Sequence, residues 1–172
     1  IPLRLVGSEM CIRDSRFEKD LAAFCGAPRA VVVVNGTCAI HAALMVLGVQ
    51  PGDEVIIPAL TFVATANAAV HAGAVPHFVD VEETSLGMDP QALQSHLERV
   101  ASSQGGQTVN KLTGRPIRAL MPVHIFGHPC RLEELAAIAR EWNLVLVEDA
   151  TEALGSTQDL SLIHISEPTR RR

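Results

Sequence analysis

Aromatic residues and positive charge are both scarce in this sequence. Aromatic residues make up 3% of the 172 residues, and the formal net charge is −5 at pH 7. A chain of this composition lacks the basic surface and the base-stacking platform that nucleic-acid-binding proteins use. Polar residues interrupt every apolar run before it is long enough to span a bilayer. We therefore expect neither a nucleic acid nor a membrane as a partner.

The sequence also lacks closely spaced cysteines and a signal-peptide pattern. The first residues contain no long apolar segment of the kind that signal peptides carry. Hydrophobic residues make up 48% of the chain, which is typical of a globular domain and not of a disordered segment. The wide cysteine spacing predicts reduced thiols and a cytoplasmic location. The cysteines are Cys11, Cys25, Cys38 and Cys130.

Several enzyme and metal motifs are absent as well. No Gly-x-Gly-x-x-Gly follows a predicted strand, and the chain has no Gly-Lys-Ser/Thr loop and no Gly-x-Ser-x-Gly turn. His124 and His128 lie four residues apart, but Gly127 and Pro129 interrupt any helix that would align them. We therefore expect no structural zinc. Other histidines are predicted to lie at the surface or in satisfied core positions: His41, His71, His77 and His96.

The two ends of the chain are related at the level of DNA. Residues 6–15 read VGSEMCIRDS, and residues 160–169 read LSLIHISEPT. The DNA word GTGGGCTCGGAGATGTGTATAAGAGACAG encodes the first segment up to an incomplete last codon. Its reverse complement encodes the second segment up to its threonine, and the word resembles a sequencing-library adapter. We therefore predict that residues 1–15 and 160–172 are non-native and that residues 16–159 are the informative region.

Short apolar runs alternate with segments of helical periodicity in this middle region. The predicted helices span residues 16–25, 38–47, 61–72, 90–101 and 132–142. The predicted strands span residues 30–34, 54–57, 75–79, 119–123 and 144–147, and a polar loop is expected at 102–115. Asp89 is the expected N-cap of the fourth helix, with Pro90 at its first position. The alternation predicts an α/β fold with a mostly parallel sheet covered by helices on both faces.

Ligands of such sheets bind beyond the carboxyl ends of the strands, so the residues that follow each strand are the candidates for a site. After the first predicted strand, Gly36 allows close backbone approach. The helix that opens at Thr37 and Cys38 offers free N–H groups to an anion such as phosphate. Thr37 as an ordinary N-cap is the alternative interpretation.

Two further residues are candidates on the same argument. Phe62 lies at the opening of a predicted helix, where it could stack on a flat ring or pack in the core. Asp149 follows the last predicted strand, where a buried carboxylate needs a cation, a metal ion or a protonated ring nitrogen. An Asp that caps the next turn is the alternative.

Five motifs in this order resemble the pyridoxal-phosphate-dependent sugar aminotransferases of the DegT/DnrJ/StrS type. They lie at residues 34–37, 51–58, 61–65, 122–128 and 147–153, and the resemblance covers nearly all of residues 16–157. Residues 85–90 and 110–116 resemble one branch of that family. This branch aminates UDP-linked 4-keto-6-deoxy-N-acetylhexosamines on the way to legionaminic acid or bacillosamine-type sugars.

The resemblance implies the large domain of the type I aminotransferase fold and a role for each candidate residue. Gly36, Thr37 and Cys38 would cradle the cofactor phosphate, and Phe62 would stack on the pyridine ring. Asp149 would pair with the ring nitrogen. Position 152 lies near the phenolic oxygen in the family and is often Gln or His. A Glu152 carboxylate would repel a phenolate unless it were protonated or turned away.

The resemblance further implies glutamate and a nucleotide sugar as substrates, and a homodimer for the full-length parent. The family's Schiff-base lysine lies in the segment after the match, and the only lysines here are Lys19 and Lys111. We therefore expect the 172-residue chain to be inactive by itself. Two other functions remain open: a sugar dehydratase of the same fold, with histidine in place of the lysine, and a non-catalytic phosphate-binding α/β module.

Overall fold

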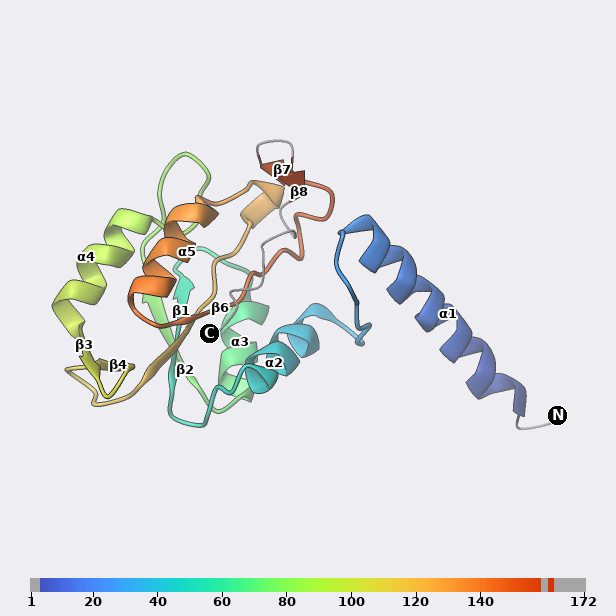
Figure 1. Cartoon of the computed structure of the whole chain (residues 1–172), viewed down its shortest axis with the longest axis horizontal. Coiled ribbons are helices and arrows are strands. Elements are labelled where there is room, and N and C mark those ends of the chain that lie inside the picture. The colour runs from blue at the N-terminus through green and yellow to red at the C-terminus, as the bar shows by residue number, and fades with distance from the viewer. Residues whose placement is uncertain (1–3, 159–160, 163–172) are drawn as a thin grey trace.

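A computed structural model describes residues 4–158 and 161–162 of the chain. Its centre is a parallel sheet (Figure 1), whose four strands have the order β2-β1-β5-β6. The strands are β1 (Glu54–Pro58), β2 (Val75–Val79), β5 (Ile117–Leu120) and β6 (Val145–Leu146). The parallel pairing predicted from the alternation of strands and helices is confirmed.

Helices cover both faces of this sheet. They are α2 (Gly36–Val46), α3 (Val63–His71), α4 (Pro90–Val100) and α5 (Leu132–Glu141). On β1, Val55 and Ile57 pack with α2 and α3, whereas Ile56 packs with α4 and α5. Successive side chains of a strand point to opposite faces, so a strand buried on both sides must be apolar at every such position.

The starts of α2 and α4 follow cap signals of the sequence. Asp89 caps α4 as predicted, and its side chain accepts a hydrogen bond from the Gln91 N–H at 2.8 Å. At α2 the cap is Asn35, so the interpretation of Thr37 as the N-cap is wrong. Asn belongs to the best N-cap residues, and its side chain satisfies the N–H of the third helical residue.

Two predicted segments differ from the structure. Residues 102–115 are not a plain loop, because β3 (Ala101–Gln104) and β4 (Gln107–Asn110) form an antiparallel hairpin across Gly105 and Gly106. Residues 30–34 were predicted as a buried strand and form none. Val31 is 80% exposed and Val34 is 85% exposed, since no described strand lies beside this run. A valine-rich segment becomes a buried strand only where a partner covers it.

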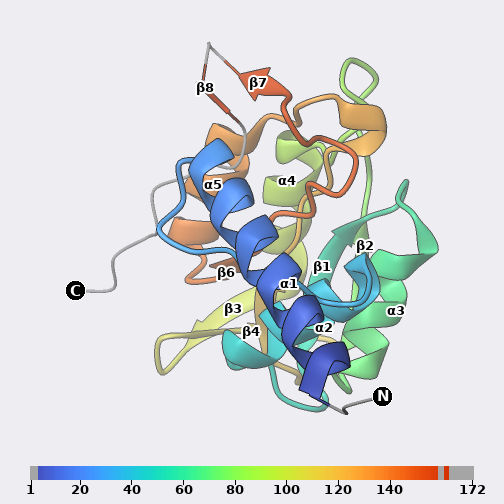
Figure 2. The same cartoon turned by 90° about the vertical axis from the view of Figure 1, so that its right-hand side faces the viewer.

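The N-terminal helix α1 (Arg4–Phe24) stands apart from the rest in Figure 1 and lies in front of it in Figure 2. It continues through the predicted helix 16–25 and through the segment predicted to be non-native, and Ile12 and Phe17 are exposed. Within α1, the Glu18 side chain accepts a hydrogen bond from the Val32 N–H at 3.0 Å. At the other end of the chain, β7 (Thr157–Gln158) pairs with β8 (Ser161–Leu162), and the remaining residues of 160–172 lie outside the described part.

A buried polar network joins the start of the sheet to α4 and to the hairpin. Glu54 is 3% exposed and accepts hydrogen bonds from Asn110 at 2.9 Å, Thr113 at 2.6 Å and His77 at 2.7 Å. His77 in turn meets His96, with 2.6 Å between their Nε2 atoms. Burial by itself raises the pKa of Glu54, but these hydrogen bonds outweigh it and hold the pKa below its ordinary value.

The histidines that were predicted to lie at the surface or in satisfied core positions also form two pairs, which the sequence did not predict. His77 and His96 form a hydrogen-bonded pair, and the rings of His41 and His71 meet edge to face with centroids 6.1 Å apart. Within residues 4–158 and 161–162, no helix is both long and apolar enough to cross a membrane.

Candidate functional site

Asp149 lies at the carboxyl end of the sheet, where the pairing of β5 and β6 continues past Pro122. The Asp149 N–H donates to the Pro122 carbonyl at 2.9 Å, and the Asp149 carbonyl accepts from the His124 N–H at 3.1 Å. These two bonds form a parallel bridge between Val123 and Asp149. The backbone of Asp149 is thus fixed by the sheet, as expected for a residue that follows a central strand.

Hydroxyl groups hold the Asp149 carboxylate in place. Asp149 is 7% exposed. Its Oδ2 accepts a hydrogen bond from Thr65 Oγ1 at 2.9 Å, and its Oδ1 accepts from Thr151 Oγ1 at 2.7 Å and from the Thr151 N–H at 3.3 Å. Within the described part of the chain, no Lys, Arg or His forms an ion pair with this carboxylate. Hydroxyl donors reduce the cost of burying the acid, and they leave it able to accept a further donor.

The N-terminus of α2 faces the same region. The Asn35 side chain accepts a hydrogen bond from the Cys38 N–H at 2.9 Å, and no described group accepts from the N–H groups of Gly36 and Thr37. A Cβ placed on Gly36 would lie 3.5 Å from Thr151 Oγ1. The first turn of α2 therefore lies next to the segment after Asp149. This turn offers the free N–H groups of a helix N-terminus.

Phe62 occupies the N-cap position of α3 and makes no side-chain cap hydrogen bond. Its side chain is 69% exposed, so the interpretation of Phe62 as a core residue is wrong. An exposed aromatic ring beside a cavity presents a flat apolar face to whatever enters.

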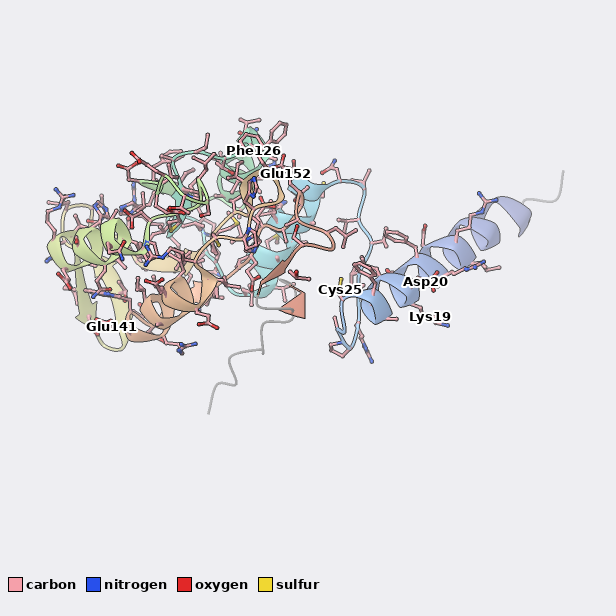
Figure 3. The ribbon with its side chains drawn as sticks, turned by 90° about the horizontal axis from the view of Figure 1, so that it is seen from above. Lys19, Asp20, Cys25, Phe126, Glu141 and Glu152 are labelled. Carbon is pink, nitrogen blue, oxygen red and sulfur yellow. The ribbon has the colours of Figure 1, made fainter. Side chains whose placement is uncertain are left out.

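Glu152 is turned toward the backbone of a tight turn. Its Oε2 accepts a hydrogen bond from the Phe126 N–H at 2.7 Å, and Figure 3 shows the two residues close together. Phe126 and Gly127 both have left-handed backbone conformations, with φ values of 53° and 77°. A Cβ on Gly127 would approach the Glu152 carbonyl to 3.0 Å, so this close contact favours glycine.

These elements enclose a cavity of about 320 Å³. Five of the six predicted site residues line it, whereas Cys38 is exposed and does not. The lining includes Gly36, Thr37, Phe62, Asp149 and Glu152. The size suits a small ligand, with a free helix N-terminus, a flat ring and an acid as its recognition groups.

Two hydroxyl residues that hold the acid of the site were not predicted from the sequence. Thr151 lines the cavity, and Thr65 lies behind the wall with no exposed surface. Thr65 precedes Asp149 by 84 residues, so no local pattern could join the two. Thr61 and Thr65 lie four residues apart within the motif at 61–65, but nothing in that motif points to Asp149.

The histidine pair considered for a metal lies outside this cavity. His124 is fully buried, and its Nδ1 accepts a hydrogen bond from the Cys130 N–H at 3.2 Å. Burial, together with the nearby charge of Glu148, raises the pKa of the Cys130 thiol to about 12. Among the described residues, no group of three His, Cys, Asp or Glu side chains is placed to hold a metal ion.

Comparison with known proteins gives one consistent result. The profile of the DegT/DnrJ/EryC1/StrS aminotransferase family matches residues 10–160. The GDP-perosamine synthase of Caulobacter vibrioides is 38% identical over 141 residues, which are 82% of this chain and 34% of that protein. The spore coat polysaccharide biosynthesis protein SpsC of Bacillus subtilis is 38% identical over 148 residues, which are 86% of this chain and 34% of that protein.

Solved structures agree with the sequence matches. A DegT/DnrJ/EryC1/StrS aminotransferase from Brucella abortus superposes with a TM-score of 0.75 at 32% identity, over 86% of this chain and 37% of that one. The chain therefore spans about a third of the length of these relatives. The prediction that it forms part of a larger α/β aminotransferase fold is confirmed.

Proposed function

The chain belongs to the DegT/DnrJ/EryC1/StrS aminotransferase family, and we propose that its cavity is part of the pyridoxal 5′-phosphate site of a sugar aminotransferase. Family members depend on this cofactor. The observation that carries the proposal is Asp149. It is a buried carboxylate that lines the cavity, and among the described residues its donors are hydroxyl and amide groups.

The residues of the cavity fit the cofactor at three points. The free N–H groups of Gly36 and Thr37 suit a phosphate, with Cys38 directly behind them. The exposed ring of Phe62 suits stacking on a pyridine ring. Asp149 suits a protonated ring nitrogen, since a buried carboxylate is best satisfied by a charged donor.

Each residue would then have a defined part in the chemistry. The bound cofactor supplies an electron sink for the electrons released when a proton leaves the substrate. Asp149 would keep the ring nitrogen protonated by accepting its hydrogen bond, and Phe62 would orient the ring and shield one face from water. Glu152 accepts a hydrogen bond from the Phe126 N–H, so its carboxylate would be partly satisfied by the backbone when a phenolic oxygen is nearby.

We extend the proposal to the full-length parent. It would transfer an amino group from glutamate to a nucleotide-linked 4-keto-6-deoxy sugar in surface-polysaccharide biosynthesis. The similarity to GDP-perosamine synthase and to SpsC supports this reaction class. The segments at 85–90 and 110–116 support the UDP-linked N-acetylhexosamine branch. We further propose a cytoplasmic homodimer. The free thiols of Cys25, Cys38 and Cys130 support a reducing compartment.

The 172-residue chain should bind the cofactor without turning over substrate. Lys19 lies in α1 and Lys111 follows β4, and neither lines the cavity. We expect no transfer from glutamate to a keto sugar by this chain alone. Release of 2-oxoglutarate by the purified chain in the presence of both substrates would contradict this expectation.

Pyridoxamine 5′-phosphate tests the proposed site, because it binds without a Schiff-base lysine. We expect the chain to bind it in a calorimetric titration, and Asp149→Asn to weaken binding by more than about tenfold through loss of a charged hydrogen bond. Asp89→Asn is the matched control, because Asn is as good an N-cap for α4 as Asp is and because Asp89 does not line the cavity. Absence of binding, or equal binding by Asp149→Asn, would refute the proposed cofactor site.

A further inference from the structure

Thr65 connects the opening of α3 to the acid of the cavity. Its side chain has no exposed surface and does not line the cavity. Thr65 Oγ1 lies 2.9 Å from Asp149 Oδ2 and 2.8 Å from Thr61 Oγ1. Three polar groups from two distant parts of the chain therefore form one continuous hydrogen-bonded row.

The direction of this row follows from the number of protons available. A threonine hydroxyl carries one proton, and an ionised carboxylate can only accept. Thr65 therefore donates to Asp149, and Thr61 must donate to Thr65. Both hydroxyl dipoles point their positive ends toward the carboxylate. Hydrogen bonds aligned in this way strengthen one another.

The other side of the carboxylate is held in a matching way. Thr151 donates to Oδ1 through its hydroxyl at 2.7 Å and its N–H at 3.3 Å, while Thr65 donates to Oδ2. The two threonines fix the plane of the carboxylate from opposite oxygens. A carboxylate has about four acceptor positions, so at least one remains for a donor in the cavity.

We propose that Thr65 is a positioning residue, which orients the Asp149 carboxylate for a protonated ring nitrogen without touching the ligand itself. The inference rests on the proposed cofactor site and adds a specific contributor to it. A role in packing alone is the competing explanation. It is reasonable because the neighbours of Thr65 on α3 are small apolar residues such as Ala68 and Ala69.

The two explanations differ in their dependence on the ring nitrogen. The test compares pyridoxamine 5′-phosphate with an analogue in which a C–H group replaces the ring nitrogen. A hydroxyl that acts through Asp149 increases the affinity only for the ligand that carries the nitrogen. Packing affects the affinity for both ligands equally. This design is a double-mutant cycle with the second change made in the ligand.

Calorimetric titrations of the 172-residue chain should give a clear pattern. Thr65→Val removes the donor at nearly constant volume, and we expect it to weaken binding of the natural ligand by roughly tenfold. Binding of the analogue should change by less than about twofold. Thr65→Ser keeps the donor and should retain most of the affinity for the natural ligand.

Thr113→Val is the matched control, because it removes another threonine hydroxyl that donates to a buried carboxylate, that of Glu54. It should leave both affinities unchanged. Equal losses of both ligands in Thr65→Val would overturn the inference and leave the cofactor site intact. Equal binding of the two ligands by the wild-type chain would also overturn it, because Asp149 would then make no interaction that depends on the ring nitrogen. If neither ligand bound, the proposed cofactor site would fail and the inference with it.

Discussion

The two ends of the sheet each bury a carboxylate, but the surroundings of the two carboxylates differ. Glu54 begins β1 and is 3% exposed, and Asp149 follows β6 and is 7% exposed. Glu54 accepts from Asn110, Thr113 and His77, so side chains of the hairpin region and of β2 surround it. Asp149 is held by two threonines and borders a cavity.

The difference shows what each acid can do. Glu54 lies in a closed network that ties β1, β2 and the hairpin together, and no ligand reaches it through the cavity beside Asp149. Its hydrogen bonds serve the fold. The Asp149 carboxylate is satisfied enough to be buried, yet it can accept one more donor. The same chemical group thus stabilises the structure at one end of the sheet and, as we propose, recognises a ligand at the other.

Glu54→Gln should have the largest effect on stability. The amide group places a donor where donors from Asn110, Thr113 and His77 already converge, so at least one buried group loses its partner. We expect the free energy of unfolding to fall by about 3 kcal/mol, as for a broken buried network. Urea denaturation followed by circular dichroism measures this loss.

Asp149→Asn is the comparison for this variant. Its amide oxygen can still accept from a threonine, so we expect a smaller loss, of about 1 kcal/mol, together with the loss of cofactor affinity. A larger loss of stability in Asp149→Asn than in Glu54→Gln would contradict the division of roles between the two acids.

The pH dependence of stability should sharpen the same contrast, with a smaller effect. Arg99 donates to His96 Nδ1, so neutral His96 donates through Nε2 to His77, and His77 donates to Glu54. Burial, His77 and Arg99 lower the pKa of His96 below 6.5, against a weaker opposing effect of Glu54. The unfolded chain therefore binds this proton first as the pH falls, and stability decreases below about pH 6.5.

Protonation of Glu54 should cause a second loss of stability at lower pH. Its folded pKa lies below the model-compound value of 4.5, so its contribution is present above pH 4.5 and is lost as the pH falls through the folded pKa. Denaturation midpoints measured from pH 8 to pH 4 should follow this course. His96→Gln should flatten the decrease just below pH 6.5 and keep the decrease below pH 4.5. An unchanged profile in His96→Gln would show that another group causes the first loss.

The sequence predicts those elements whose signals are local. Helix α4 has a cap at Asp89 and a proline at its first position, and its predicted boundaries lie within one residue of the observed Pro90–Val100. β2 has the predicted bounds. The hairpin at 101–110 was missed, although the pair Gly105 and Gly106 is a known hairpin signal, because its strands are polar and lack alternation. The run at 30–34 was predicted wrongly because burial depends on a neighbouring strand.

The residues of the candidate site likewise fall into those that local signals predict and those that they do not. Asp149 and Gly36 could be found because each follows an apolar run, and Phe62 because it opens a helix. Thr65 could not, since its role depends on a contact across 84 residues. Nor could the sequence show that Glu152 turns to the Phe126 N–H, because that depends on the left-handed turn at Phe126 and Gly127.

That turn gives the smallest of the expected effects. Glu152→Ala removes the acceptor of the Phe126 N–H and should lower the free energy of unfolding by about 1 kcal/mol or less. Glu152→Gln keeps an acceptor oxygen and should lose only a fraction of that. Amide hydrogen exchange separates the variants, because the Phe126 N–H should exchange faster in Glu152→Ala than in Glu152→Gln. Equal exchange in both would show that the carboxylate does not hold the turn. A charge at position 152 would then be free to face the cavity, and the site would have to tolerate a second acid beside Asp149.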